Sequence, residues 1–368
     1  MALMLVYFLL ATPAMNDDGF YYEGFAESLA KGKLDFKSFY GFQGLSFFAV
    51  PVFWLTGSHN SIIIASIIFS LLSIPLAFLV GRAYYNSDKA GWYFLALFLL
   101  MPYSYTTMFR GFQEAALLFF IFLILYGSFR NKVWAPLAWA VGGIVKPFAL
   151  VLAPVWITPL QGLTLGVDNF FRKKLFFLLS ALLIGAAYLG ANYYQTGHWV
   201  NNAAINSYQG NFDTGNPPPL GESFAPSLKG YLRVGANLLL YFRKVMISPL
   251  VIILGAWSLW FSKNLKLRKE IIMAIILNFL LVGSLTFSFS KYLLPMTTLF
   301  ALAAVPYLIK NFWLRMLVLV DSFFVFKPIF SHFGINFWSN FYLYILPLFL
   351  VAVILLIPWK KFLARQSL

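Results

Sequence analysis

Apolar segments recur along the whole of this chain, and turns that carry Lys or Arg separate them. An α-helix of about 20 apolar residues is long enough to cross the hydrocarbon core of a bilayer. The alternating pattern of a membrane β-barrel is absent from the sequence. Segment 44–57 is too short to span comfortably, so we expect it to be a re-entrant or interfacial helix. We predict an all-α polytopic membrane protein with about 12 transmembrane helices, at residues 1–15, 60–81, 90–108, 112–128, 132–145, 147–160, 174–192, 244–262, 270–289, 292–309, 312–330 and 337–358.

The composition supports a membrane protein and excludes several other classes. Hydrophobic residues make up 61% and charged residues 11% of the chain, whereas soluble domains carry about 25% charge. A net charge of +15 would suggest nucleic acid as a partner of a soluble protein. Here the charge follows the predicted topology, so we expect no nucleic acid. The lack of cysteine excludes disulfides, thiolate metal sites and cysteine nucleophiles.

The charged residues also indicate the orientation in the membrane. With the N-terminus inside, most of the 27 Lys and Arg residues fall on cytoplasmic loops, and most of the 12 Asp and Glu residues fall on the opposite side. This distribution follows the positive-inside rule. We therefore predict a multi-pass protein of the plasma (inner) membrane, with both termini cytoplasmic and the active site facing outside.

The first outer loop, residues 16–59, holds five of the 12 acidic residues, and four of these five lie between residues 16 and 32. Asp17 and Asp18 directly follow the first predicted span, where a carboxylate can draw a proton from an acceptor hydroxyl as a general base. The same residues are also ordinary helix caps. Residues 19–34 are predicted to form an amphipathic helix that lies flat at the interface, with Phe20, Tyr21, Phe25, Leu29 and Leu34 on its membrane side. Such a helix would hold the aspartates where a water-borne acceptor meets a lipid headgroup.

Three further polar residues mark the outer ends of predicted spans. Glu114 opens the fourth span, where it either benefits only from the helix macrodipole or acts as a second carboxylate facing Asp18. Arg110 beside it can clamp a phosphate. Lys146 lies near membrane depth, where a cation costs a few kcal/mol unless it is paired. It either snorkels to the headgroups or binds a phosphate, and we favour the phosphate.

The remaining outer residues carry weaker signals. Lys291 and Lys244 can bind the same phosphate or simply anchor the interface. Loop 195–243 mixes aromatic residues with Asn and Gln, which suits sugar binding but also occurs in any ordered outer loop. It contains His198, one of three histidines, so a histidine-rich metal site is not expected. Asp321, inside a span, is either functional or paired with a neighbouring helix.

In their order and common sidedness, these motifs resemble the GT-C superfamily of integral-membrane glycosyltransferases, which includes protein O-mannosyltransferases and the aminoarabinose transferases of lipid A. The first outer loop of that family typically reads Asp-Glu-x-x-Tyr, followed by Ala, Leu and Gly at regular spacing. This chain fits the spacing at Asp18, Tyr21, Tyr22, Ala26, Leu29 and Gly32. Gly19 stands where the family usually has Glu, which leaves the second carboxylate role to Asp17 or Glu114. Lys146-Pro147 matches a recurrent Lys-Pro or Lys-Gly turn, and the segment from Lys291 to Pro295 resembles an Arg-Tyr-Leu-x-Pro turn with Lys in place of Arg.

The resemblance covers roughly residues 1–310, a GT-C-like transmembrane catalytic core that includes outer loops 16–59 and 195–243. Residues 311–368 are predicted to add C-terminal transmembrane helices. The family implies a polyprenyl-phosphate-linked sugar donor and an inverting transfer to a hydroxyl of a protein, glycan or lipid outside the cytoplasm. It implies catalysis by Asp18 with Asp17 or Glu114. We expect substrate binding by Arg110, Lys146, Lys291, His198, Tyr22 and Lys244. Some members use Mg²⁺ or Mn²⁺, but we expect no metal to be required because the cations can neutralise the phosphate.

Two other functions stay open for such a chain. A multispan transporter or lipid flippase would show midplane charge, broken helices or internal repeats, and apart from Asp321 the predicted spans are nearly free of charge. An O-antigen ligase or polymerase would carry key Arg and His residues on a large late outer loop. Loop 195–243, with His198, Arg233 and Arg243, is compatible with that class. A ligase-type mechanism should survive the loss of Asp18.

Overall fold

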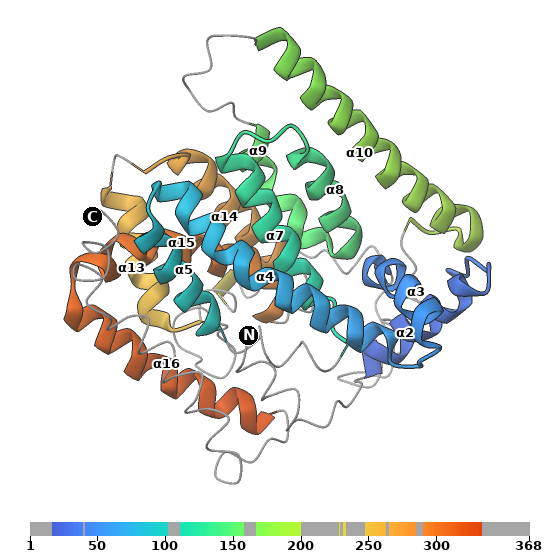
Figure 1. Ribbon diagram of the computed structural model, residues 1–368, viewed down its shortest axis with the longest axis horizontal. Helices are drawn as coiled ribbons and strands as arrows, with labels where there is room; N and C mark the ends of the chain where they lie inside the picture. The colour runs from blue at the N-terminus through green and yellow to red at the C-terminus, as the bar shows by residue number, and fades with distance from the viewer. Residues whose placement is uncertain are drawn as a thin grey trace, which may run out of the picture.

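The computed structural model of the protein describes residues 17–39, 41–101, 111–157, 167–199, 228, 231–232, 247–262, 265–284 and 290–332. Within these ranges, the side chains of residues 17–18, 167–173, 290–291 and 323–332 are not described. Every regular element in the described residues is a helix (Figure 1), as the sequence predicts. The predicted spans 1–15 and 337–358 lie outside the described residues.

The helices form one layered bundle with two long helices at opposite edges (Figure 1). Helices α4, α5 and α7 pack together, α13 packs on α15, and α15 is buried from Leu294 to Val305. Helices α10 and α16 run along the two edges. The elements are α2 (Asp17–Ala30), α3 (Gly44–Thr56), α4 (Ser61–Tyr85), α5 (Asp88–Leu99), α7 (Glu114–Phe129), α8 (Ala135–Val145), η1 (Pro147–Leu152), α9 (Ala153–Ile157), α10 (Val167–Thr196), α13 (Pro249–Phe261), α14 (Arg268–Gly283), η3 (Ser290–Leu293), α15 (Leu294–Lys310) and α16 (Phe312–His332).

Helices α2 and α3 form a unit at the start of α4, beside the end of α10 (Figure 1). The helix predicted for residues 19–34 runs from Asp17 to Ala30, and Gly32 has φ 77°, a left-handed conformation that ends it. The prediction that Phe25 faces the membrane is wrong. Its ring is fully buried because it packs edge-on against Phe39 and Phe47, so it joins α2 to the loop and to α3.

The loop between α2 and α3 is held by polar contacts at two points. Asp35 accepts hydrogen bonds from the hydroxyl and N–H of Ser38 and from the N–H of Lys37. These bonds, that of the Ser38 hydroxyl first, lower the pKa of Asp35 below its usual value. Gln195 at the end of α10 accepts from the Phe36 N–H at 2.8 Å and donates to the Leu34 carbonyl at 2.6 Å. The first outer loop is thereby tied to the start of the predicted loop 195–243.

Two helices of the described residues are long and apolar enough to cross a membrane, Ser61–Tyr85 and Lys174–Thr196. Several other apolar helices there are shorter, so the count of 12 spans stays a prediction. The predicted spans 132–145 and 147–160 correspond to two short helical segments that break at Lys146. At 11 residues, α8 is about 16 Å long, roughly half the hydrocarbon thickness.

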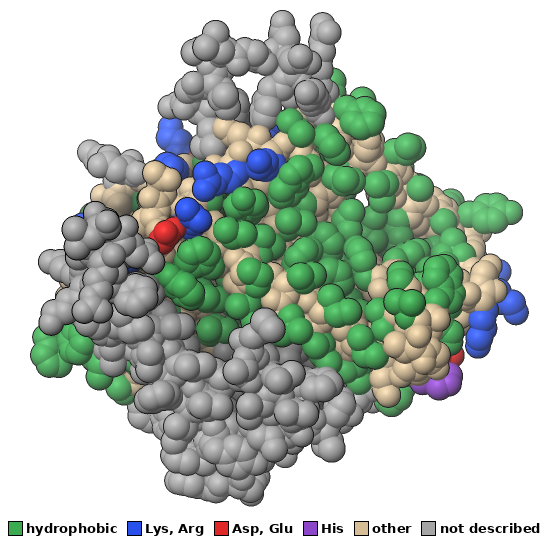
Figure 2. Space-filling view, viewed as in Figure 1, with side chains coloured by type: hydrophobic (Ala, Val, Ile, Leu, Met, Phe, Trp, Pro, Cys, Tyr) green, Lys and Arg blue, Asp and Glu red, His purple; other side chains and the backbone are tan. Residues whose placement is uncertain are grey.

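The surface supports a membrane location. Figure 2 shows hydrophobic side chains across a broad face, with Lys and Arg gathered towards its edges. Large apolar side chains such as Leu183, Trp257 and Trp260 are more than half exposed. Monomeric soluble proteins rarely expose contiguous apolar patches of this kind. The fold and composition therefore describe a membrane protein.

Helices α3 and α8 are in close contact at Gly44, and a substitution there tests how the two helices pack. A methyl group on Gly44 would overlap the backbone of Val145, and backbone atoms cannot move aside by changing rotamer. We expect Gly44→Ala to destabilise the protein by about 1–3 kcal/mol, the usual cost of overpacking. The measurement is the thermal unfolding midpoint in detergent. Gly190→Ala is the control, because no atom lies within 4 Å of its added methyl group. Equal midpoints for the two variants would contradict the packing of α3 on α8.

Candidate active site

The turn before α7 places a buried carboxylate at the start of that helix. Gly111 has φ 70°, in the left-handed region that favours glycine. The side-chain N–H of Gln113 donates to the Phe42 carbonyl, which ties this turn to the segment before α3. Glu114 follows as the first residue of α7 and is fully buried. The positive end of the α7 dipole favours a carboxylate there.

Lys146 lies where the backbone breaks between α8 and η1. Pro147 disfavours a helical conformation for the residue before it, and Lys146 is extended, with φ −157° and ψ 132°. Its N–H still donates to the Gly142 carbonyl at 2.8 Å, which closes the last turn of α8. Its ammonium group contacts the Oε1 atom of Glu114 in an ion pair, and its side chain is only 12% exposed. The sequence predicted both residues as site residues but not their contact.

An aromatic ring completes the surroundings of this pair. The Lys146 ammonium lies 5.5 Å from the centroid of the Tyr292 ring, within the range of a cation–π interaction. Tyr292 stacks on Phe148 with centroids 4.4 Å apart. Buried Asn278 of α14 donates to the Tyr292 carbonyl at 3.2 Å and accepts from the Met296 N–H at 3.3 Å. Asn278 thus fixes the segment that carries Lys291 and Tyr292, a role that no local pattern in the sequence indicates.

The start of α2 lies against the turn that leads to Glu114. The Cα of Gly19 is 3.5 Å from where a Cβ on Gly111 would stand. Asp17 and Asp18 are the first two residues of α2, so their backbone lies beside this turn. Their side chains are not described, and the choice between base and helix cap stays a prediction.

Of the other predicted site residues, Tyr22 and His198 have described side chains, and the remaining three do not. Tyr22 is largely buried in the core, and its carbonyl accepts from the Ser46 hydroxyl at 2.9 Å. His198 is exposed just beyond the end of α10, where its N–H donates to the Thr196 hydroxyl at 3.1 Å. Arg110 and Lys244 lie outside the described residues, and only the backbone of Lys291 is described. Their roles as phosphate ligands remain predictions.

No group of three or more His, Asp or Glu residues that could hold a metal ion occurs in the described part of the chain. That no metal is required stays a prediction. The described geometry offers a buried carboxylate–ammonium pair under an aromatic ring, at the end of the bundle where α2 begins.

Comparison with known proteins identifies the fold. No protein-family model matches the chain, and no curated protein sequence matches it. The structure is similar to the crystal structure of ArnT from Cupriavidus metallidurans in the apo state, with a TM-score of 0.57 and 13% identity over 96% of this chain and 74% of that one. The same protein bound to undecaprenyl phosphate matches with a TM-score of 0.57 and 14% identity, over 96% of this chain and 73% of that one.

The chain therefore adopts the all-helical fold of a membrane protein of known structure. The particular protein whose architecture it shares is ArnT, a protein with the GT-C fold. This agrees with the GT-C resemblance seen in the sequence.

The buried ion pair gives a second test. Removing one partner leaves an uncompensated buried charge, which costs about 3–5 kcal/mol. We expect Glu114→Gln and Lys146→Met each to lower the unfolding midpoint strongly. The double variant should lower the midpoint by no more than half of the sum of the two single losses. Asp88→Asn is the control, since the Arg82–Asp88 pair is half exposed and exposed pairs contribute about 1 kcal/mol or less. Simple additivity of the two single losses would show that the residues do not form a pair.

Proposed function

We propose that this protein is an inverting glycosyltransferase. It moves a sugar from a polyprenyl-phosphate donor to an acceptor hydroxyl on the extracytoplasmic side of the membrane. The observation that carries the proposal is the ArnT-like fold over 96% of the chain, with Glu114, Lys146 and the start of α2 gathered at one end of the bundle. The ArnT structure with bound undecaprenyl phosphate supports the class of donor.

The reaction is a single displacement. The acceptor oxygen attacks the anomeric carbon and forms the new glycosidic bond, while the bond from that carbon to the phosphate oxygen breaks. Asp18 takes the acceptor proton, since a positioned carboxylate can act as a general base. The polyprenyl phosphate leaves as a stable anion and needs no general acid. Attack opposite the leaving group inverts the anomeric configuration.

Lys146 stabilises the phosphate as it leaves. Charge that is held in place before the reaction stabilises a developing anion most effectively, and Glu114 and Tyr292 hold the Lys146 ammonium in a nearly buried position. Arg110, Lys291 and Lys244 add positive charge around the same phosphate. Tyr22 and His198 are proposed to contact the substrates.

One feature weighs against the transporter or flippase. Asp321, the charge inside a predicted span, accepts hydrogen bonds from the Ser248 hydroxyl and from the Leu250 N–H at 3.2 Å. It caps the start of α13, so the feature that most suggested a transporter has a structural role.

Sugar transfer in reconstituted vesicles tests the proposal. Wild-type protein is supplied with a polyprenyl-phosphate sugar and a hydroxyl acceptor, and NMR identifies the anomer of the product. We expect inversion, and we expect Asp18→Asn to slow transfer by about 10²–10⁴-fold, the usual contribution of a general base. Undiminished transfer by folded Asp18→Asn would move the base to Asp17 or Glu114, or favour the ligase class. Solute or lipid movement without transfer would favour a transporter or flippase.

The same assay tests the metal requirement. If Lys146 and the neighbouring cations neutralise the leaving phosphate, chelation by EDTA should leave the transfer rate within about twofold, since charge stabilisation at the leaving group is already supplied. Titration of Mg²⁺ and Mn²⁺ into metal-free protein is the measurement. Strict dependence on either ion would contradict this part of the mechanism.

A further inference from the structure

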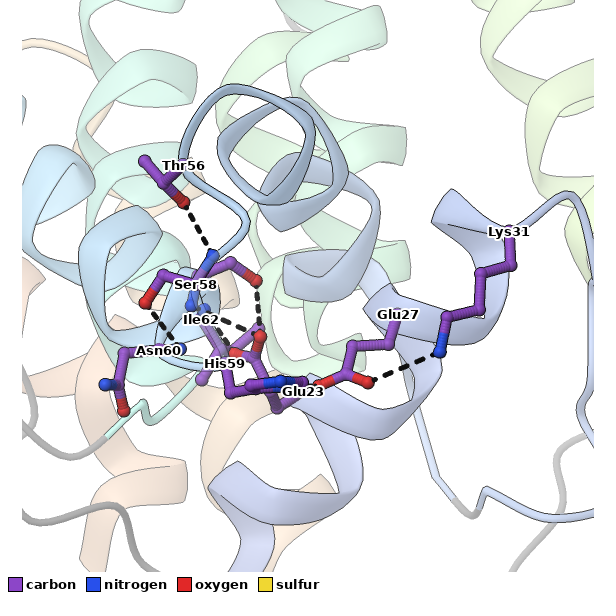
Figure 3. Close-up of polar contacts among 9 residues, drawn as sticks. Glu23, Glu27, Lys31, Thr56, Ser58, His59, Asn60 and Ile62 are labelled. Carbon is purple, nitrogen blue, oxygen red and sulfur yellow. Dashed lines mark hydrogen bonds and ion pairs between the residues drawn. The ribbon is translucent and has the colours of Figure 1, made fainter.

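Glu23, in the second turn of α2, has both carboxylate oxygens in use (Figure 3). Oε1 accepts from the N–H of Ser61 at 3.2 Å and from its hydroxyl at 2.7 Å, and Oε2 accepts from the N–H of Ile62 at 2.7 Å. The side chain is 4% exposed. All these donors belong to the first two residues of α4.

Glu23 on α2 supplies the hydrogen-bond acceptors for the start of α4, because the residue at the cap position of α4 does not supply them. The first N–H groups of a helix have no partner within that helix, and the side chain of Asn60 at the cap position does not cap α4. A carboxylate at a helix start gains both charge-assisted hydrogen bonds and a favourable interaction with the dipole. Glu23 therefore joins α2 rigidly to the start of the long helix α4.

This tether lies next to the candidate active site. Gly19, one turn before Glu23, approaches Gly111, and a Cβ on Gly111 would stand 2.8 Å from Ile62, the residue that Glu23 caps. On the other side of α2, the Tyr22 carbonyl is held by Ser46 of α3. The position of α2 relative to the turn before Glu114 therefore depends on the contact between Glu23 and α4.

We infer that Glu23 is a positioning residue for the transfer reaction, an inference that rests on the proposed function. It holds α2 on α4, so that Asp18 stands at a fixed position relative to Glu114 and Lys146. It is not the base, because both of its oxygens are engaged with donors. The acidic residues of the first outer loop thus have separate roles, since Glu27 pairs at the surface with His59 and with Lys31 at 3.8 Å (Figure 3).

The test is Glu23→Gln in the vesicle transfer assay. Glutamine keeps the size but presents an NH₂ group to the donors of α4, which loosens α2. We expect kcat to fall by roughly a hundredfold, because a shift of about 1 Å in a reacting group costs that much. KM for the donor should stay within about twofold, since Lys146 is on a different element. Unchanged kcat overturns the inference.

Asp321→Asn is the matched control. Asp321 caps α13 from another helix in the same manner and is not part of the proposed site. The Asp321→Asn variant should lower the unfolding midpoint as Glu23→Gln does, but it should leave kcat within about twofold of the wild-type value. An equal fall in kcat for both variants would mean that lost stability alone explains the effect, and would overturn the inference.

A second substitution separates capping from tethering. Adding Asn60→Asp to Glu23→Gln gives α4 a local carboxylate cap without rejoining α2. We expect the unfolding midpoint to recover while kcat stays low. Recovery of kcat together with stability would show that Glu23 only caps α4, against the inference.

Amide hydrogen exchange distinguishes failure of this inference from failure of the proposed function. In Glu23→Gln, residues 17–31 should exchange faster than in wild type, and this readout needs no substrate. Faster exchange with undiminished transfer overturns the positioning role alone. Absence of transfer by the wild-type protein overturns the proposed function, and the positioning role falls with it.

Discussion

The buried contact between Glu114 and Lys146 is the interaction on which the candidate active site at one end of the bundle depends. Burying either charge alone would cost several kcal/mol, yet here each stands at the end of a helix that favours it. Glu114 is the first residue of α7, and Lys146 follows the last residue of α8, so the two helix dipoles stabilise the two charges. The backbone break that Pro147 imposes after α8 allows this placement. Tyr292, held by Asn278, then brings α14 and η3 to the same point.

Carboxylates at helix starts recur in the described residues. Glu114 begins α7, Glu23 caps α4 and Asp321 caps α13. At the opposite end of α13, Arg268 donates to the carbonyls of Leu259 and Trp260. Apolar helices in a bilayer have little water at their ends inside the protein, so charged side chains from neighbouring helices satisfy the exposed backbone groups. An acidic residue in such a chain is therefore as often a structural cap as a catalyst, and its role follows from its partners.

The sequence predicted the features that arise from local patterns. The short helix expected at 44–57 is present as α3, the break at Lys146-Pro147 is present, and each predicted span from 60–81 to 312–330 contains a helix among its described residues. The contacts that build the site were not predictable, since Glu114 and Lys146 lie 32 positions apart and Glu23 and Ser61 lie 38 apart. No periodicity specifies such partners. For the same reason Phe25 was assigned to the membrane side, although aromatic partners from the following loop and from α3 enclose it.

The partners also narrow the choice of base within the proposed mechanism. A carboxylate that already holds an ammonium group gains little by taking a proton, because protonation would forfeit the ion pair. That argument applies to Glu114, which faces Lys146 at the start of α7. A carboxylate with both oxygens engaged by helix N–H and hydroxyl donors is restricted in the same way, and this applies to Glu23. Asp17 and Asp18 are the first two residues of α2, and Gly19, the next residue, lies beside the Gly111 turn. In the proposed mechanism the acid–base task therefore falls to the aspartates, and we propose that Glu23 and Glu114 fix the distance between the proton acceptor and the cation that receives the phosphate.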